Sequence, residues 1–206
     1  MHHLATLFQS SSSFQAYAQG YTERLAAVLK EIDRDALAQA VEIIDQAFQA
    51  QKALYVIANG GSAAVAAHIV NDLVAGGYVE GPPPFRVFSL SDNLATVTAL
   101  GNDAGFDYIF ERQLRVYLNP GDVVLAMSVS GNSPNILNAV AYARAHEAKT
   151  IGFCGFTGGK LAPACDVSLH IPTTLDEYGP VEDAFSVLGH IFVGYLSMKR
   201  GKLLHH

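Results

Sequence analysis

Three serine hydroxyls lie close together in one glycine-containing turn, at Ser128, Ser130 and Ser133. The turn follows the apolar run Val123–Ala126 and precedes a helical pattern, so we expect it to connect a strand to a helix. Free backbone N–H groups, the positive end of a helix dipole and the hydroxyls suit a phosphate dianion without any lysine. The sequence therefore predicts a phosphorylated small molecule as ligand. The predicted contacts in this turn are Ser128, Val129, Ser130, Asn132 and Ser133.

A structural explanation of the same turn is also open, because Ser133 and Pro134 make an ordinary N-cap and first-turn pair. A second glycine-rich turn favours the functional interpretation. The buried run Leu54–Ile57 leads through this turn into a helix-like segment from Ala63 to Ala75. The predicted binding residues of this second turn are Asn59, Gly60, Gly61 and Ser62.

Two carboxylates and two imidazoles have spacings that could place them in one pocket. His68 and Asp72 are four residues apart in the helix that follows the Asn59–Ser62 turn, so their side chains share one face. Glu182 and His190 are two turns apart on the last helix. Together these four residues form a candidate site for a divalent metal, with zinc as the first candidate. The structural alternative is that a histidine on an apolar helix is a hydrogen-bonded core residue.

The elements that must position these residues follow an alternating order. Apolar positions at helical spacing predict two helices between about Ser12 and Ala50, with a break near Ile32–Arg34, and a last helix from about Pro180 to Lys199. Short strands alternating with helices predict an α/β fold with a five-stranded parallel sheet covered on both faces. The ligand is then expected at the carboxyl ends of the strands. The predicted strands are Ala53–Ile57, Arg86–Ser89, Asp122–Met127, Thr150–Phe153 and Val167–Ile171.

Composition excludes several classes of function. A formal charge of −6, with 13 Lys plus Arg against 19 Asp plus Glu, argues against nucleic-acid binding. No apolar run reaches the length of a membrane span and the N-terminus lacks a signal-peptide pattern, so we expect a cytoplasmic protein without membrane contact. Cys154 and Cys165 have no metal-site or disulfide spacing and are expected to be reduced. The terminal histidines His2, His3, His205 and His206 receive no function.

Several segments resemble the sugar isomerase (SIS) domain family, and within it the phosphoheptose isomerase branch. The resemblance runs from about Ala40 to Leu196. Its most general feature is the turn Ser128–Ser133, which we call the serine loop. The Asn-Gly-Gly-Ser turn, the Gly-Asn-Asp segment and the two histidines are more specific to the branch. The matching segments are Ala58–Ser62, His68, Leu90–Asp92, Gly101–Asp103, Phe106–Asp107, Pro120–Leu125, Ser128–Asn135, Gly158–Leu161 and His190.

The resemblance implies a single-domain, three-layer SIS fold over residues 51–200, preceded by an N-terminal helical segment over 1–50 that packs on the domain and in oligomer contacts. It implies a homotetramer with active sites at subunit interfaces and an aldose–ketose isomerase working through an enediol. Sedoheptulose 7-phosphate is the expected substrate, and the product is expected in heptose synthesis for lipopolysaccharide or a related surface glycan. The serine loop would hold the phosphate, with help from Asn59 and Ser62, and Asp103 matches a substrate-contacting aspartate.

The metal and catalytic positions of the branch fall on His68, Asp72, Glu182 and His190, the four residues that spacing also selects. We expect Asp72 to move the proton between C1 and C2, and His190 to serve the sugar oxygens as acid and base. Glu182 would contact the substrate as well as the metal. A bound zinc could polarise the carbonyl.

The chain departs from the branch at four positions. The branch usually has glutamate at Asp72, glutamine at Glu182, arginine at Gly76 and aspartate at Gly179. A shorter base and lost contacts leave open an isomerase for a different phosphosugar. Two further alternatives are a non-catalytic tetrameric SIS protein that binds a replication initiator and a sugar-phosphate-sensing domain. The first generally lacks the metal and acid–base set, and no basic DNA-reading segment points to the second.

Overall fold

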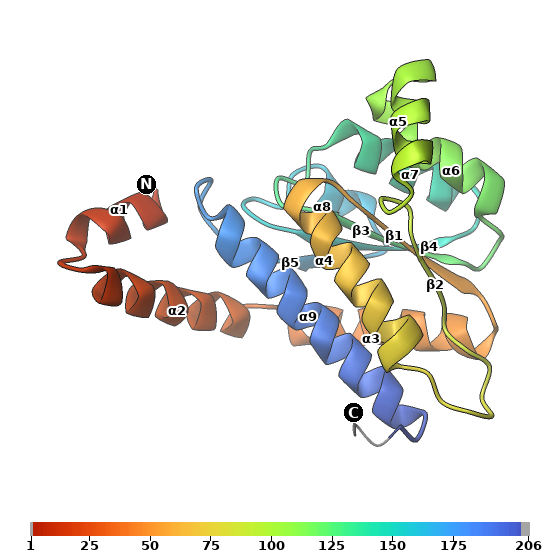
Figure 1. Cartoon of the computed structure of the whole chain (residues 1–206), viewed down its shortest axis with the longest axis horizontal. Helices are drawn as coiled ribbons and strands as arrows, with labels where there is room; N and C mark the ends of the chain where they lie inside the picture. The colour runs from red at the N-terminus through yellow and green to blue at the C-terminus, as the bar shows by residue number, and fades with distance from the viewer. Residues whose placement is uncertain (1, 203–206) are drawn as a thin grey trace.

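The computed structural model describes residues 2–202 and contains one five-stranded sheet (Figure 1). All strands are parallel, in the order β2-β1-β3-β4-β5. Each predicted strand is present and ends within one residue of its predicted boundary, which confirms the α/β fold. Their bounds are β1 (Ala53–Ala58), β2 (Arg86–Ser89), β3 (Val123–Ser128), β4 (Lys149–Cys154) and β5 (Val167–His170).

Helices cover both faces of the sheet, because the central strands are apolar on both sides. Alternate residues of β1 divide between two cores: Leu54 and Val56 pack in one, Tyr55 and Ile57 in the other. The first core contains α3 (Arg34–Gln49), α4 (Gly60–Asn71) and α9 (Tyr178–Lys199). The second contains α6 (Ile109–Tyr117), α7 (Pro134–Ala145) and α8 (Leu161–Ala164). The result is a three-layer domain.

Two helices precede this domain and lie beside it (Figure 1). The predicted break before α3 is confirmed, since Asp33 caps α3 with its side chain. The sequence prediction missed α1 (His3–Ser10), which is amphipathic but buries no residue. The next helix, α2 (Phe14–Lys30), buries only Val28. A short helix that buries no residue has little tertiary packing to reveal it, so its sequence pattern alone predicts it poorly.

The helix predicted from Ala63 to Ala75 is present, but its start and its last turn differ from the prediction. It begins earlier, as α4 at Gly60, and changes at Asp72 into a π turn, η1 (Asp72–Gly76). The backbone N–H of Gly77 donates to the Asp72 carbonyl at 2.6 Å, the five-residue step of a π-helix. Such single π turns are frequent at functional sites.

The last helix also begins earlier than predicted, at Tyr178 rather than Pro180. Pro180 falls within the first helical turn, where no intrahelical N–H bond is required.

Two short elements complete the second face, α5 (Leu94–Asp103) and the 3₁₀ turn η2 (Phe106–Tyr108). None of the α5 residues is buried, and the helix extends away from the sheet (Figure 1). Within residues 2–202 no helix is both long and apolar enough to cross a bilayer. His205 and His206 lie outside the described residues.

Candidate functional site

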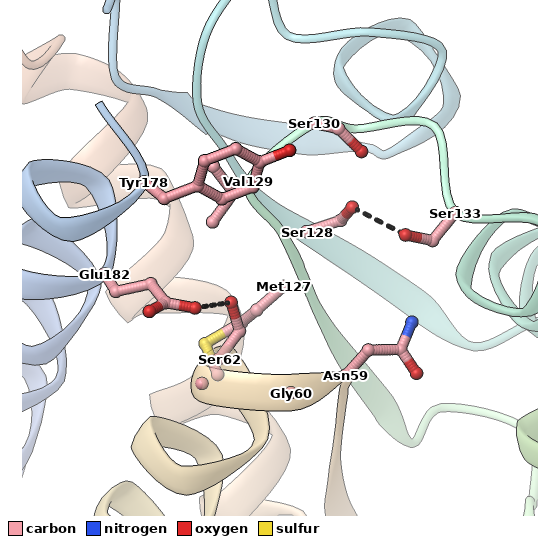
Figure 2. A pocket seen from close by; sticks show the side chains of 11 residues that line it. Asn59, Gly60, Ser62, Met127, Ser128, Val129, Ser130, Ser133, Tyr178 and Glu182 are labelled. Atoms are coloured by element: carbon pink, nitrogen blue, oxygen red, sulfur yellow. Dashed lines mark hydrogen bonds between the residues drawn. The ribbon is translucent and has the colours of Figure 1, made fainter. Parts of the chain in front are cut away.

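The two glycine–serine turns meet at one pocket because β1 and β3 are neighbours in the sheet, with Ala58 opposite Met127. The chain leaves β1 toward β2 on one side and returns to β3 on the other, which opens a crevice at their carboxyl ends. A cavity of about 310 Å³ occupies it (Figure 2). Its walls are Asn59, Gly60, Gly61, Ser62, Met127, Ser128, Val129, Ser130, Ser133, Tyr178 and Glu182.

The serine loop presents its hydroxyls along one wall of this pocket (Figure 2). Ser133 occupies the N-cap position of α7, yet its side chain makes no capping bond and instead lies 3.2 Å from the Ser128 Oγ. The Ser130 Oγ accepts from the Asn132 backbone N–H at 3.2 Å. The purely structural explanation of Ser133 is therefore incomplete, because its hydroxyl is turned toward another hydroxyl of the loop rather than toward its own helix.

The loop between β4 and α8, residues 155–160, packs against the serine loop and fixes its shape. Gly131 has a φ of +64°, and a Cβ there would lie 2.1 Å from the Gly158 carbonyl oxygen. Gly159 faces it in turn, with the Ser130 carbonyl oxygen 2.5 Å from the position of a Cβ. The Asn132 side chain also faces this loop, accepting from the Lys160 N–H at 3.2 Å. Backbone therefore packs directly on backbone, which only glycine permits at these positions.

A pair of amides joins the two glycine–serine turns. Asn59 and Asn135 each donate an Nδ2 hydrogen to the other's Oδ1 at 2.9 Å. Asn135 is buried and also holds the Ile136 N–H with its Oδ1. The sequence analysis assigned Asn59 to substrate but gave no role to Asn135, because two amides distant in sequence carry no pairing signal. This contact holds the two walls of the pocket in register.

The electrostatics of the pocket come from helix ends and one carboxylate. The N–H groups of the first turn of α4 begin at Gly60 and have no intrahelical acceptor, so they favour an anion. Within the described part of the chain, no Lys or Arg lines this pocket. Opposite the serine loop, the Glu182 carboxylate accepts from the Ser62 Oγ at 3.0 Å (Figure 2). A Cβ on Gly61 would lie 2.4 Å from Glu182 Oε2, so any larger residue there would displace that carboxylate from its present position.

Tyr178 is a pocket residue that the sequence analysis missed. It is the first residue of α9, and its ring extends toward Ser130 in Figure 2. The ring also packs edge-on against Phe156, with centroids 4.9 Å apart. An aromatic residue just before Gly179 and Pro180 was the available signal, but the Pro180 start placed it in a loop.

A cluster of two histidines and one aspartate lies where α4 and its π turn pack beside α9. The ligand atoms of His68, Asp72 and His190 all lie within 4.8 Å of one another. The two imidazole Nε2 atoms are 2.9 Å apart, and Asp72 Oδ2 lies 3.3 Å from His68 Nε2 and 3.6 Å from His190 Nε2. The π turn carries Asp72, whose side chain is about a quarter exposed, whereas both imidazoles are about half exposed.

These three residues fit a divalent metal by donor type and spacing. In tetrahedral zinc with Zn–N near 2.0–2.1 Å, neighbouring ligand atoms are about 3.3 Å apart. The three separations here are 2.9, 3.3 and 3.6 Å. Two histidines and one carboxylate are also a common catalytic set, which leaves a fourth position open for water or substrate. Zinc therefore remains the first candidate.

Glu182 is not part of this cluster, although the sequence analysis assigned it as a fourth metal ligand. Eight residues separate it from His190 on α9, about 12 Å along the helix axis. Its carboxylate is instead bound by Ser62 inside the phosphate pocket. Spacing alone suggested a shared face, but the rise of the helix separates the two groups.

Two other predicted contacts lie outside the pocket walls of this chain. Asn132 turns its side chain away, donating to the Ser130 carbonyl at 2.9 Å. Asp103 is exposed at the end of α5, where it accepts from the Asn102 side chain at 2.8 Å. The remaining predicted substrate contacts line the pocket.

The departures from the branch pattern have structural counterparts. A Cβ on Gly76 would meet nothing within 4 Å, so this position in the π turn faces open space. A Cβ on Gly179 would lie 2.7 Å from the Tyr21 hydroxyl, which donates to Asp183 at 2.6 Å. Tyr21 therefore fills the space that a side chain at 179 would need.

The fold and the pocket together define an open α/β domain with a cavity at adjacent strand ends whose hydroxyl and backbone N–H donors suit a phosphate ester. The chain belongs to the SIS domain family, which matches residues 16–155.

Its relatives include phosphoheptose isomerases. That of Rhodospirillum rubrum is 38% identical over 159 residues, covering 77% of this chain and 83% of the relative. That of Pelobacter propionicus is 40% identical over 151 residues, covering 73% and 77%. The solved phosphoheptose isomerase from Neisseria gonorrhoeae superimposes with a TM-score of 0.82 at 26% identity, over 90% of this chain and 100% of that one. These matches confirm the resemblance to the phosphoheptose isomerase branch.

Proposed function

We propose that this chain is a phosphosugar aldose–ketose isomerase that converts sedoheptulose 7-phosphate into glycero-manno-heptose 7-phosphate. The observation that carries the proposal is the placement of two sites on one pair of helices. The N-terminal ends of α4 and α9 contribute to the phosphate pocket. His68 and His190 lie further along the same helices, and Asp72 begins the π turn that directly follows α4. The similarity to phosphoheptose isomerases supports this substrate.

The phosphate is proposed to occupy the serine loop. Ser128, Ser130 and Ser133 offer hydroxyl donors, and the first turn of α4 offers backbone N–H groups. A phosphate anchored at one end aligns the rest of an extended sugar, which lowers the entropic cost of reaching the catalytic groups. Glu182, held by Ser62, lies between anchor and cluster as an acceptor for sugar hydroxyls.

The chemistry is proposed to begin at the His68–Asp72–His190 cluster. Isomerisation through an enediol requires a base that removes a proton from one carbon and returns it to its neighbour. Asp72 is assigned that role, because it is the carboxylate of the cluster and a carboxylate can take a proton from one carbon and return it to the next on the same face. His190 is assigned the oxygen protons, as an imidazole of the same cluster.

A metal is part of the proposal because the cluster fits one. His68, Asp72 and His190 would hold it. When bound, zinc would supply Lewis-acid polarisation of the substrate carbonyl.

The test is proton NMR of sedoheptulose 7-phosphate in D₂O with the protein and stoichiometric zinc. An aldose deuterated at C2 would establish an enediol isomerase. If the sugar binds but neither turns over nor exchanges, the pocket serves another phosphosugar or a binding role. A pull-down against a replication initiator then tests the non-catalytic alternative.

We also propose that the protein is a homotetramer whose active sites are completed by neighbouring copies. The exposed apolar side chains of Phe8, Phe14 and Leu94, each more than two-thirds exposed, support self-association through α1, α2 and α5. Asp103 supports it as well, since its expected substrate contact cannot be made in its own pocket as described. Sedimentation equilibrium checks the assembly, and a monomer at micromolar concentration would refute it.

The location is proposed to be cytoplasmic, and the product to enter heptose synthesis for a surface glycan. The free cysteines Cys154 and Cys165 fit a reducing compartment.

A further inference from the structure

Two side chains of α2 reach the beginning of α9, next to the phosphate pocket. Arg24 donates from Nε to Glu177 Oε1 at 2.7 Å and from Nη2 to Oε2 at 3.0 Å. One turn earlier on α2, Tyr21 donates to Asp183 at 2.6 Å. The two contacts hold α9 on both sides of its first turn.

The first contact continues into the loop before α9. Glu177 is fully buried and also accepts from the Thr174 backbone N–H at 2.6 Å. Thr174 in turn donates its hydroxyl to Asp176 at 2.6 Å. A buried carboxylate with this many donors fixes its own backbone closely, because each lost bond would leave a buried charge unsatisfied. Glu177 therefore fixes the point from which α9 starts.

The residues next to these anchors in the chain are pocket walls. Tyr178 comes directly after Glu177, and Glu182 directly precedes Asp183. On α9, Asp183 faces α2 while Glu182 faces Ser62 of α4. Hydrogen bonds from two different helices thus set the rotation of this turn, and with it the directions of the Tyr178 ring and the Glu182 carboxylate.

We propose that Tyr21 and Arg24 are positioning residues that hold Tyr178 and Glu182 in the geometry that binds a phosphosugar. Neither residue lines the pocket itself, so its effect passes through Asp183 or Glu177. Val28 is the one fully buried residue of α2, and Leu25 and Leu29 pack partly buried against the same core, so these polar contacts add to a small apolar attachment of α2.

Hydrogen exchange and ligand binding test the proposal with three variants. Tyr21→Phe removes one hydroxyl, and Arg24→Lys keeps the charge but loses the two-pronged contact. Arg115→Lys is the matched control, because Arg115 contacts Glu111 with the same two guanidinium nitrogens, at 3.0 and 2.7 Å, on α6. Exchange is read for a peptide over residues 178–188, and binding is read with inorganic phosphate and then with sedoheptulose 7-phosphate.

In Arg24→Lys we expect exchange in this peptide to rise about tenfold or more while other core peptides stay unchanged. Phosphate binding should weaken about fivefold or more, and KM should rise by a similar factor with kcat within about threefold. Tyr21→Phe should act in the same direction and more weakly, and it decides the matter if Arg24→Lys does not fold. The control should match the wild type.

Unchanged exchange and unchanged phosphate binding in both α2 variants would overturn the proposal, as would a loosening spread evenly over the core. The kinetic part rests on the proposed function. Exchange and phosphate binding do not, so a wild-type protein without isomerase turnover would refute that function while these two measurements still judge the role of Tyr21 and Arg24.

Discussion

The Nε2 atoms of His68 and His190 lie 2.9 Å apart, with the two rings nearly perpendicular at 86°. One nitrogen of such a contact must donate and the other must accept, so a single proton lies between the two rings. A metal ion that replaces this proton would be bound by both lone pairs. The same two atoms that hydrogen-bond in this structure are thus the candidate ligands.

Metal binding should separate the three-residue cluster from the four-residue set expected from the sequence. We expect His68→Ala and His190→Ala each to weaken zinc binding by about a hundredfold or more, because each removes one of three ligands. Glu182→Gln should retain affinity within about threefold, since its carboxylate lies in the phosphate pocket. Competition with a chromogenic chelator measures all three. An equal loss in Glu182→Gln would restore Glu182 to the ligand set.

Removing the base should affect turnover far more than binding. Asp72→Asn should lower kcat by about a hundredfold or more, because an amide cannot accept the carbon-bound proton. Asp72→Glu restores the residue usual in the branch and should retain measurable turnover. Deuterium incorporation followed by NMR gives both rates, with the exposed Asp35→Asn as control. Full activity in Asp72→Asn would assign the base elsewhere.

The serine loop should not tolerate a methyl group at Gly131. Its Cβ would lie 2.1 Å from the Gly158 carbonyl oxygen, so Gly131→Ala must displace one loop and should weaken phosphate binding about tenfold or more. Gly81→Ala is the control, because Gly81 has a φ of +105° but nothing within 4 Å of the added carbon. Calorimetric titration with inorganic phosphate compares the two. Equal binding in both variants would show that the loops yield without cost.

Acid should destabilise the protein through Glu177. Burial alone raises the pKa of its carboxyl, but hydrogen bonds from Arg24 and Thr174 outweigh it and lower that pKa below the usual value. A lowered folded-state pKa contributes stability above the unfolded value of about 4.3, and this is lost as pH falls through the folded pKa. Urea unfolding from pH 6 to pH 3 should therefore show a declining free energy of unfolding.

Glu177→Gln should flatten part of that decline. Asp176 leaves a remaining slope in the same direction. Burial raises the pKa of its carboxyl, but hydrogen bonds from the Thr174 hydroxyl and from the backbone N–H groups of Ala5, Asp176 and His3 outweigh it and lower that pKa to about 2. A variant as steeply dependent on pH as the wild type would remove Glu177 from this account.

The cysteines should be inert in the folded protein. Burial raises the pKa of the Cys154 thiol to about 12, and burial likewise raises that of Cys165 to about 12. At pH 8 almost no thiolate is present, so we expect alkylation by iodoacetamide to be at least about a hundredfold slower in the native protein than in urea. Mass spectrometry counts the adducts. Rapid labelling of Cys154 in the native state would contradict its burial.

The sheet was predictable because buried parallel strands are nearly continuous apolar runs, as in Val123–Ala126. The pairing of His68 with Asp72 was predictable from helical spacing alone. Glu182 shows where that reasoning stops, because the angle around a helix says nothing of the distance along it. Tyr178 was missed because the helix start was placed at Pro180 instead of Tyr178. The Asn59–Asn135 pair depends on a tertiary contact between distant segments, and local patterns carry no information about it.

The absence of Lys and Arg from the described pocket walls has a consequence for ionic strength. A site that attracts phosphate with side-chain cations loses affinity steeply as salt screens them, since the Debye length is only about 8 Å at physiological salt. Short-range hydroxyl and backbone N–H donors depend on contact geometry instead. If neighbouring copies add no cation to the site, ligand retention should therefore change little between dilute buffer and concentrated salt, and the association rate should gain little from long-range electrostatic steering.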